Sequence, residues 1–301
     1  MPDRQQHAGP IDSAGLLGWF RARAVPGMEA VGDRSYVRTV RTDSGTAGIA
    51  FEFTDDGGST TNGPTFTVHA DTDRARSEAT VIARRLFDLD ADTAAVDAAL
   101  SADPVLARLV AATPGIRVPG AAGLAEILVR AIVGQQVTVA AARGQLTRLV
   151  IELGEPAAAA VTPPALRDDP TDPRPALVFP TAATIAEHGG RVIRGPRARI
   201  DTVIGVCAAI ADGSLTVDDH PTVPDLIDRL TALRGIGPWT ADYVAMRLLG
   251  APDILVRKDV ALLRGARALG LADSFGELTA AAARFAPWRS YLSMHLWAAS
   301  T

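Results

Sequence analysis

The feature that most constrains this chain is a short turn at residues 233–237 (LRGIG), which lies between two apolar helical runs. Its two glycines, one residue apart, are expected to supply the positive φ angles of a tight turn. Pro238 suits the first turn of the next helix, where a missing N–H costs nothing. The free backbone N–H groups at that helix N-terminus and the helix dipole favour a bound anion, such as phosphate.

Residues of potential chemical use follow the turn closely. Trp239 and Tyr243 are four residues apart and therefore share one face of the predicted helix. Asp259 follows a break at residues 250–253 and precedes a third helical run. Taken alone, an Asp in that position is typical of a helix N-cap, which stabilises a helix by about 1 kcal/mol. The stretch 226–263 thus combines a predicted phosphate site, an aromatic face and a carboxylate.

These residues in this order resemble the helix-hairpin-helix motif, with its following aspartate, of the DNA base-excision glycosylases. The closer resemblance is to the AlkA-type 3-methyladenine DNA glycosylases II. Further matching stretches fall in family order over roughly residues 13–299: 17–19 (LGW), 23–25 (RAV), 86–89 (LFDL), 114–120 (PGIRVPG), 130–137 (RAIVGQQV), 179–181 (FPT) and 287–291 (PWRSY). A lone GIG turn is weak evidence, whereas this ordered set is strong.

The hydrophobic periodicity predicts two parts. Strand-like runs at 35–40, 47–53 and 65–69, with helices at 13–24 and 72–89, predict an N-terminal α+β domain over residues 1–102, of which 1–12 form a disordered tail. The loop at 55–64 is almost purely turn-forming.

From residue 103 to 301 the pattern predicts a mainly α-helical core. Helical segments are expected at 123–153, 181–189, 198–212, 223–233, 238–249, 259–269 and 276–284. Residues 154–178 are rich in proline and mixed charge and are expected to form a surface excursion. The resemblance implies a helix-hairpin-helix glycosylase core of two bundles, with the DNA in a cleft between 124–251 and the bundle made by 103–123 with 252–301.

Composition narrows the class of protein. The net charge is −4, which argues against a protein that holds DNA by bulk electrostatics but not against a local basic face. Cys207 is the single cysteine, in an apolar helical run, so it is expected to be a buried packing residue and cannot hold an iron–sulfur cluster. The sequence contains no apolar run near the length of a membrane span and no visible secretory signal, so a cytoplasmic protein is expected.

The resemblance also implies roles for particular residues. Asp259 is the expected catalytic carboxylate, and Gln136 is expected to enter the gap that a flipped base leaves. The base pocket would be lined by Trp239, Tyr243, Trp297 and Trp19, and phosphate would be bound by Gly235, Ile236, Gly237 and Thr240. No cofactor is expected to be required, although a structural Na⁺ or K⁺ ion is implied in the hairpin at the carbonyls of Thr231, Leu233 and Ile236.

The chain departs from the family pattern near the aspartate. Arg257 stands where the family usually has a proline, two residues before Asp259. Val260 stands where a bacterial relative has a tyrosine, so one wall of the pocket is expected to be thinner. Trp239 occupies the position at which glycosylases that are also lyases carry their Schiff-base lysine, and no amine nucleophile is therefore expected there.

These expectations lead to one preferred function and two alternatives. The preferred function is a monofunctional, monomeric DNA glycosylase without AP-lyase activity that removes alkylated purines, such as 3-methyladenine, from double-stranded DNA by base flipping. The first alternative is a glycosylase for deaminated or oxidised bases. The second, from another class, is a non-catalytic module that binds damaged DNA.

Overall fold

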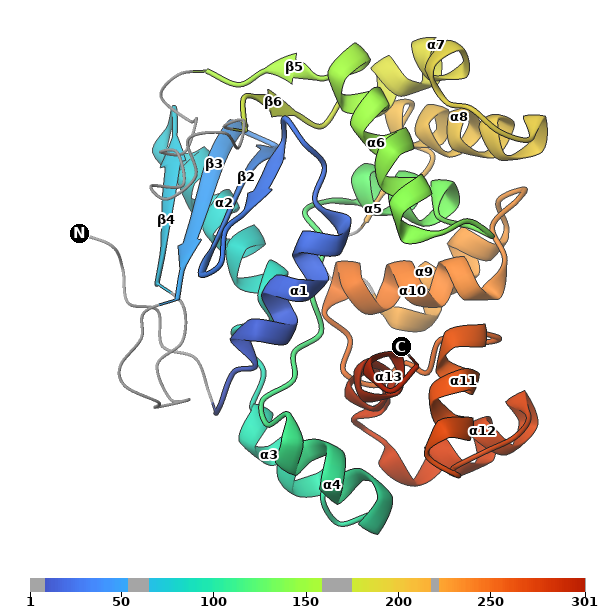
Figure 1. Cartoon of the computed structure of the whole chain (residues 1–301). Coiled ribbons are helices and arrows are strands. Elements are labelled where there is room, and N and C mark those ends of the chain that lie inside the picture. The colour runs from blue at the N-terminus through green and yellow to red at the C-terminus, as the bar shows by residue number, and fades with distance from the viewer. Residues whose placement is uncertain (1–8, 54–64, 159–174, 218–221, 301) are drawn as a thin grey trace.

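A small antiparallel sheet lies at one side of the molecule, and helices make up most of the remainder (Figure 1). The computed structural model describes residues 9–53, 65–158, 175–217 and 222–300. The fold class expected from the sequence, an α+β N-terminal part followed by a mainly helical core, is confirmed. Within the described residues, no helix is long and apolar enough to cross a membrane.

The N-terminal part is a four-stranded sheet flanked by two helices. Its strands pair in the order β1-β2-β3-β4, and one face carries a cross-strand row of aromatic rings, with Tyr36 opposite Phe51 and Phe51 opposite Phe66. These rings, with Phe20 and Phe87, form the buried core that fixes the register. In chain order the elements are α1 (Ser13–Arg23), β1 (Glu29–Val31), β2 (Ser35–Thr42), β3 (Gly45–Glu52), β4 (Thr65–Ala70) and α2 (Asp73–Leu86). The sequence prediction missed the short β1, and the loop predicted at 55–64 lies outside the described residues.

The remaining elements are almost all helical. They are α3 (Thr93–Leu100), α4 (Pro104–Ala112), α5 (Leu124–Val133), α6 (Val139–Leu153), β5 (Glu155–Pro156), β6 (Leu177–Val178), α7 (Ala182–Val192), α8 (Arg197–Ala211), α9 (Val223–Thr231), α10 (Pro238–Leu249), α11 (Val260–Ala268), α12 (Phe275–Ala282), the 3₁₀ turn η1 (Ala283–Phe285) and α13 (Arg289–Ala298). The segment predicted as one helix at 123–153 is two helices, because residues 134–138 form a loop. Helices α3, α4 and α13 were not among the predicted segments.

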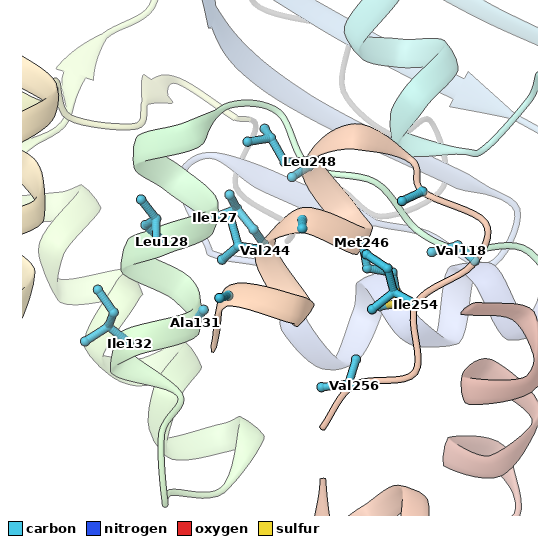
Figure 2. Close-up of a cluster of buried hydrophobic side chains, with 14 of the residues drawn as sticks. Val118, Ile127, Leu128, Ala131, Ile132, Val244, Met246, Leu248, Ile254 and Val256 are labelled. Atoms are coloured by element: carbon cyan, nitrogen blue, oxygen red, sulfur yellow. The ribbon is translucent and has the colours of Figure 1, made fainter. Parts of the chain in front are cut away.

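The helical core is centred on the contact between α5 and α10. Figure 2 shows Ile127, Leu128, Ala131 and Ile132 of α5 near Val244, Met246 and Leu248 of α10, with Val118, Ile254 and Val256 completing the cluster. These side chains are at most 6% exposed, so this contact is dry. It gives the residues at the ends of both helices a rigid base.

A closed square of buried charges joins the sheet to α5. Arg38 of β2 contacts Glu29 of β1 at 3.3 Å and Glu126 of α5 at 2.8 Å, and Arg130 of α5 contacts the same two carboxylates at 2.6 and 2.8 Å. Burial raises the pKa of Glu29, but the charges of Arg130 and Arg38 outweigh this effect and lower that pKa to about 2. Since each charge has two opposite partners, the sheet cannot shift against α5 without exposing unpaired buried charge.

Two contacts join residues 103–123 to other parts of the helical core, one to η1 and one to α10. Arg284 of η1 forms an ion pair of 2.7 Å with Asp103, the N-cap of α4. The amide of Ala121 donates to the carbonyl of Arg247 at 2.9 Å. The chain from 103 to 123 thus connects both sides of the helical core.

The predicted disordered tail is too long by several residues. Residues 9–12 are held in place, because the Pro10 carbonyl accepts hydrogen bonds from Thr93 and Arg117 and the amide of Asp12 donates to the Gly115 carbonyl. Asp12 then caps α1 through its side chain. Residues 1–8 lie outside the described residues.

Cys207 is a packing residue, as expected. It lies in α8 and is fully buried, and burial raises the pKa of its thiol to about 12. Such a thiol stays protonated and unreactive near neutral pH.

Asp88 is an ionisable group at the junction of the two parts. Its backbone has a φ of 51°, and its carboxylate accepts hydrogen bonds from the Val118 amide at 3.1 Å and the Tyr291 hydroxyl at 2.9 Å. Burial raises the pKa of Asp88 from 3.8 to about 6, against the opposing effect of these donors and of Arg117. The negative charge of Asp90 also raises the pKa of Asp88.

We expect Asp88→Asn to remove part of the pH dependence of stability. The folded state holds the Asp88 proton more tightly than the unfolded state, so this group lowers the free energy of unfolding as pH rises from about 4 through 6. The penalty is on the order of 2–3 kcal/mol above pH 7. Asn keeps an acceptor oxygen and tolerates a positive φ. Urea denaturation at pH 4.5 and pH 7.5 should show the variant gaining stability relative to wild type at the higher pH, and an unchanged difference would contradict this prediction.

Candidate functional site

Asp259 is both a helix cap and a buried carboxylate that two indoles hold. Its Oδ1 accepts a hydrogen bond from the Leu262 amide at 2.8 Å, which begins α11. Its Oδ2 accepts from Trp239 Nε1 at 2.7 Å, and Oδ1 also accepts from Trp297 Nε1 at 3.3 Å. The residue is 7% exposed. The bonds satisfy a carboxylate that burial would otherwise penalise, and they place it where α10, α11 and α13 meet.

The aromatic residues predicted to line a pocket form one connected cluster. Trp239 and Tyr243 lie nearly parallel, with ring centroids 5.2 Å apart and an interplanar angle of 7°. Trp297 meets Tyr243 edge-on, with ring centroids 6.3 Å apart. Trp297 also contacts Trp19, with centroids 5.7 Å apart and the rings tilted by 39°. Because Trp239 and Tyr243 stack directly on each other, a planar ligand has no room between these two rings. The surfaces left for stacking are the outer faces of the cluster.

Two arginines that sequence reasoning missed belong to the same cluster. The Arg23 guanidinium lies over Trp19, 3.5 Å from the ring centroid, and Arg247 donates to the Tyr243 hydroxyl at 2.7 Å. Burial lowers the pKa of Arg23. Burial raises the pKa of Tyr243, but the positive charges of Arg247 and Arg23 outweigh it, and the net shift is downward. Each arginine follows its aromatic partner by four residues, so the helical spacing that paired Trp239 with Tyr243 could have found both.

These side chains surround a single cavity of about 990 Å³. Its lining includes residues of α1, on the sheet side, and of α10, α11 and α13. Its wall includes the residues expected there: Asp259, Trp239, Tyr243, Trp297 and Trp19. The volume is at the upper end of the range for small-molecule pockets, about 300–1,000 Å³. Among the described residues, no cluster of three or more His, Cys, Asp or Glu could hold a metal ion.

The hairpin turn requires glycine at one of its two positions. Gly235 has a φ of 86°, and a Cβ there would lie 2.1 Å from Thr202 Oγ1 of α8. Gly237 differs from the sequence expectation, because its φ is −94° and it is the N-cap of α10 in extended conformation. No side chain caps α10, so the amides at its N-terminus stay available to a ligand. Leu233 and Ile236 bond across the turn, with the Ile236 amide donating to the Leu233 carbonyl at 3.1 Å.

Of the two further residues expected to contact DNA, Gln136 is exposed and Thr240 is buried. Gln136 is exposed in the loop between α5 and α6, with a φ of 55°. Thr240 is 2% exposed, and its hydroxyl accepts a hydrogen bond from Gln135 Nε2 at 2.9 Å. In this structure the Thr240 hydroxyl therefore holds the Gln135 side chain.

The two departures from the family pattern have structural explanations. Arg257 forms a two-pronged ion pair with the buried Asp242 of α10, at 2.8 Å from Nε and 2.7 Å from Nη2, and its amide donates to the same carboxylate at 2.9 Å. Val260 is 66% exposed and lies outside the cavity wall, which includes its neighbour Ala261. The α11 register turns the Val260 side chain to solvent, so this side chain forms no part of the cavity wall.

The chain matches known proteins over nearly its whole length. Residues 4–123 match the family model described as the AlkA N-terminal domain, which extends past the boundary expected at residue 102. A Mycobacterium tuberculosis protein named "Probable bifunctional transcriptional activator/DNA repair enzyme AlkA" is 38% identical over 293 residues, which cover 96% of this chain and 55% of that protein. This chain therefore spans about half the length of that relative.

Two further proteins match over nearly their full lengths. The "DNA-3-methyladenine glycosylase 2" of Escherichia coli is 30% identical over 291 residues, 96% of this chain and 94% of that protein. The structure of a 3-methyladenine DNA glycosylase from Archaeoglobus fulgidus superposes with a TM-score of 0.77 and 16% identity, covering 98% of this chain and 97% of the other. At that identity the structural likeness shows the shared fold.

We expect Trp239→Phe to destabilise the protein through Asp259. The substitution keeps an aromatic ring but removes the donor 2.7 Å from a buried carboxylate oxygen. The loss should lower the free energy of unfolding by about 1–3 kcal/mol. Trp288→Phe is the matched control, because the Trp288 ring packs edge-on against Tyr291 and takes no part in holding Asp259. Equal losses in the two variants, measured by urea denaturation, would show that the Trp239–Asp259 bond contributes nothing.

Proposed function

Since this chain belongs to the AlkA family of DNA-3-methyladenine glycosylases, we propose that it hydrolyses the N-glycosidic bond of alkylated purines in double-stranded DNA. The observation that carries this proposal is the buried Asp259 carboxylate in the wall of an aromatic cavity. Family membership does not favour the two alternatives, a glycosylase for deaminated or oxidised bases and a non-catalytic binding module. We propose that one chain acts as a monomer, because the carboxylate and the aromatic cavity belong to the same chain.

The chemistry needs little beyond this carboxylate. A purine alkylated at N3 or N7 is cationic and is already a good leaving group, so the reaction requires little general-acid help. Asp259 stabilises the oxocarbenium-like sugar as the base departs, or orients the attacking water. The indole N–H groups of Trp239 and Trp297 hold the carboxylate still, so little reorganisation is needed during the reaction.

Base flipping assigns roles to the other residues. The flipped base enters the cavity and stacks on the outer faces of Tyr243, Trp297 and Trp19, where a cationic base gains roughly 0.5–2 kcal/mol from cation–π attraction. This gain offsets part of the free-energy cost of flipping the base, which is roughly a few kcal/mol. Gln136 fills the gap left in the duplex.

The hairpin holds the DNA backbone. The amides at residues 235–237 bind a phosphate, consistent with the uncapped N-terminus of α10. We propose that a structural sodium or potassium ion binds in the same turn at the carbonyls of Thr231, Leu233 and Ile236. The Leu233 carbonyl accepts one hydrogen bond within the turn and keeps a second lone pair for such an ion.

The central test is base release from DNA treated with a methylating agent. We expect wild type to release methylated purines. Asp259→Asn should release them at a rate lower by about 100-fold, while still binding abasic-site DNA. Asp253→Asn is the control, because Asp253 forms its ion pair with Arg289 outside the cavity wall. Failure of wild type to release any methylated purine would contradict the proposal.

The enzyme is expected to leave an intact abasic site. Lyase chemistry requires an amine nucleophile, and the hairpin position carries Trp239. Lys258, the single lysine of the chain, precedes Asp259 and is exposed. Borohydride treatment during turnover should therefore trap no covalent protein–DNA adduct. A trapped adduct that disappears in Lys258→Arg would overturn this expectation and identify the nucleophile.

A further inference from the structure

The loop between α5 and α6 contains a strained residue at its tip. Gln136 has a φ of 55°, in the left-handed region that non-glycine residues rarely adopt, and it is exposed. A conformation of this kind costs free energy and persists only when its surroundings impose it. The contacts of its neighbours should therefore show what imposes it.

Gln135 is held by three different helices. Its amide donates to the Ile132 carbonyl of α5 at 3.2 Å, and its own carbonyl accepts from Arg199 Nη2 of α8 at 2.6 Å. Its side-chain Nε2 donates to the Thr240 hydroxyl of α10 at 2.9 Å. The residue just before Gln136 is thus restrained through both its backbone and its side chain.

These contacts lead to the catalytic carboxylate. Thr240 follows Trp239, whose indole donates to Asp259 at 2.7 Å. The dry contact between α5 and α10 supports both ends of the Gln135–Thr240 bond (Figure 2). Gln135 in the loop and the Asp259 carboxylate are therefore both hydrogen-bonded to the same helix, α10.

We propose that Gln135 is a positioning residue. Through Thr240 and Arg199 it keeps Gln136 in its left-handed conformation, with the side chain directed outward to fill the gap beside a flipped base. This inference rests on the proposed function, because it requires DNA from which a base has been displaced. Gln135 and Thr240 should therefore affect DNA binding only where the duplex has a gap that Gln136 must fill.

The test compares the affinities of abasic-site DNA as a duplex and as a single strand. A duplex has a gap opposite the unpaired base, whereas a single strand has none. We expect Gln135→Ala to weaken duplex binding about tenfold, which corresponds to the loss of one hydrogen bond, and to change single-strand binding less than twofold. Thr240→Val should reproduce this pattern because it keeps the shape and removes the hydroxyl, and Thr240→Ser should restore wild-type binding.

Two further variants separate positioning from general destabilisation. In a Gln136→Ala background, Gln135→Ala should cause no further loss of duplex affinity, because its effect acts through Gln136. Gln145→Ala is the matched control. Its side-chain amide joins α6 to the Arg194 backbone at 3.1 and 3.2 Å and bonds to neither Gln135 nor Gln136, so its loss should leave both affinities unchanged.

The outcomes distinguish this inference from the proposed function. Equal losses on duplex and single strand, or additive losses in the double variant, would overturn the positioning role even if bases are released. The expected binding pattern without any base release from methylated DNA would support the positioning role and overturn the catalytic proposal.

Discussion

A buried carboxylate must be hydrogen-bonded, and this requirement at Asp259 organises the helical half of the molecule. The side chain needs a donor for each oxygen, and it obtains donors from α10, α11 and α13. The three helices must therefore end or pass within hydrogen-bond reach of one point. The donors are one amide and two indoles, so the same contacts that satisfy the charge also place aromatic rings around it. Helix capping and the proposed catalytic role are thus served by one arrangement, and the carboxylate is preorganised because the fold requires its hydrogen bonds.

The sheet contributes to the cavity through electrostatics as well as through packing. The buried square of Glu29, Arg38, Glu126 and Arg130 ties the first strands to α5, and all four residues also line the cavity. Arg130 also donates to the Arg23 carbonyl at 3.2 Å, at the end of the helix that carries Trp19. The charged network therefore ties the end of α1 to α5, which packs against α10. Its cost in desolvation is offset only while all four partners are present, which explains why the N-terminal part cannot act as a loosely attached accessory.

The sequence predicted those parts of the site that depend on local rules. The turn at Gly235 was predicted because a positive φ favours glycine, and the shared face of Trp239 and Tyr243 was predicted because helical spacing is a short-range property. The break at 134–138 was missed because Gln136 adopts a glycine-like conformation without being glycine. Its cause is the contact of Gln135 with α8 and α10, far along the chain. Gly237 was expected to supply a positive φ, but its φ is negative. As the N-cap of α10 it has no side chain to cover the helix amides.

Arg257 shows how a departure from a family pattern can preserve its physical purpose. A proline two residues before the aspartate restricts the backbone by fixing φ. Arg257 lacks that restriction, but its guanidinium and its amide both bind the carboxylate of Asp242, which is 2% exposed. Three hydrogen bonds to a residue in the middle of α10 anchor the chain just before Asp259 to the helix that carries Trp239. Proline could not make this contact, because it has no N–H to donate. The backbone leading to the carboxylate is therefore restrained by a long-range ion pair in place of a covalent ring, and its placement depends on α10 directly.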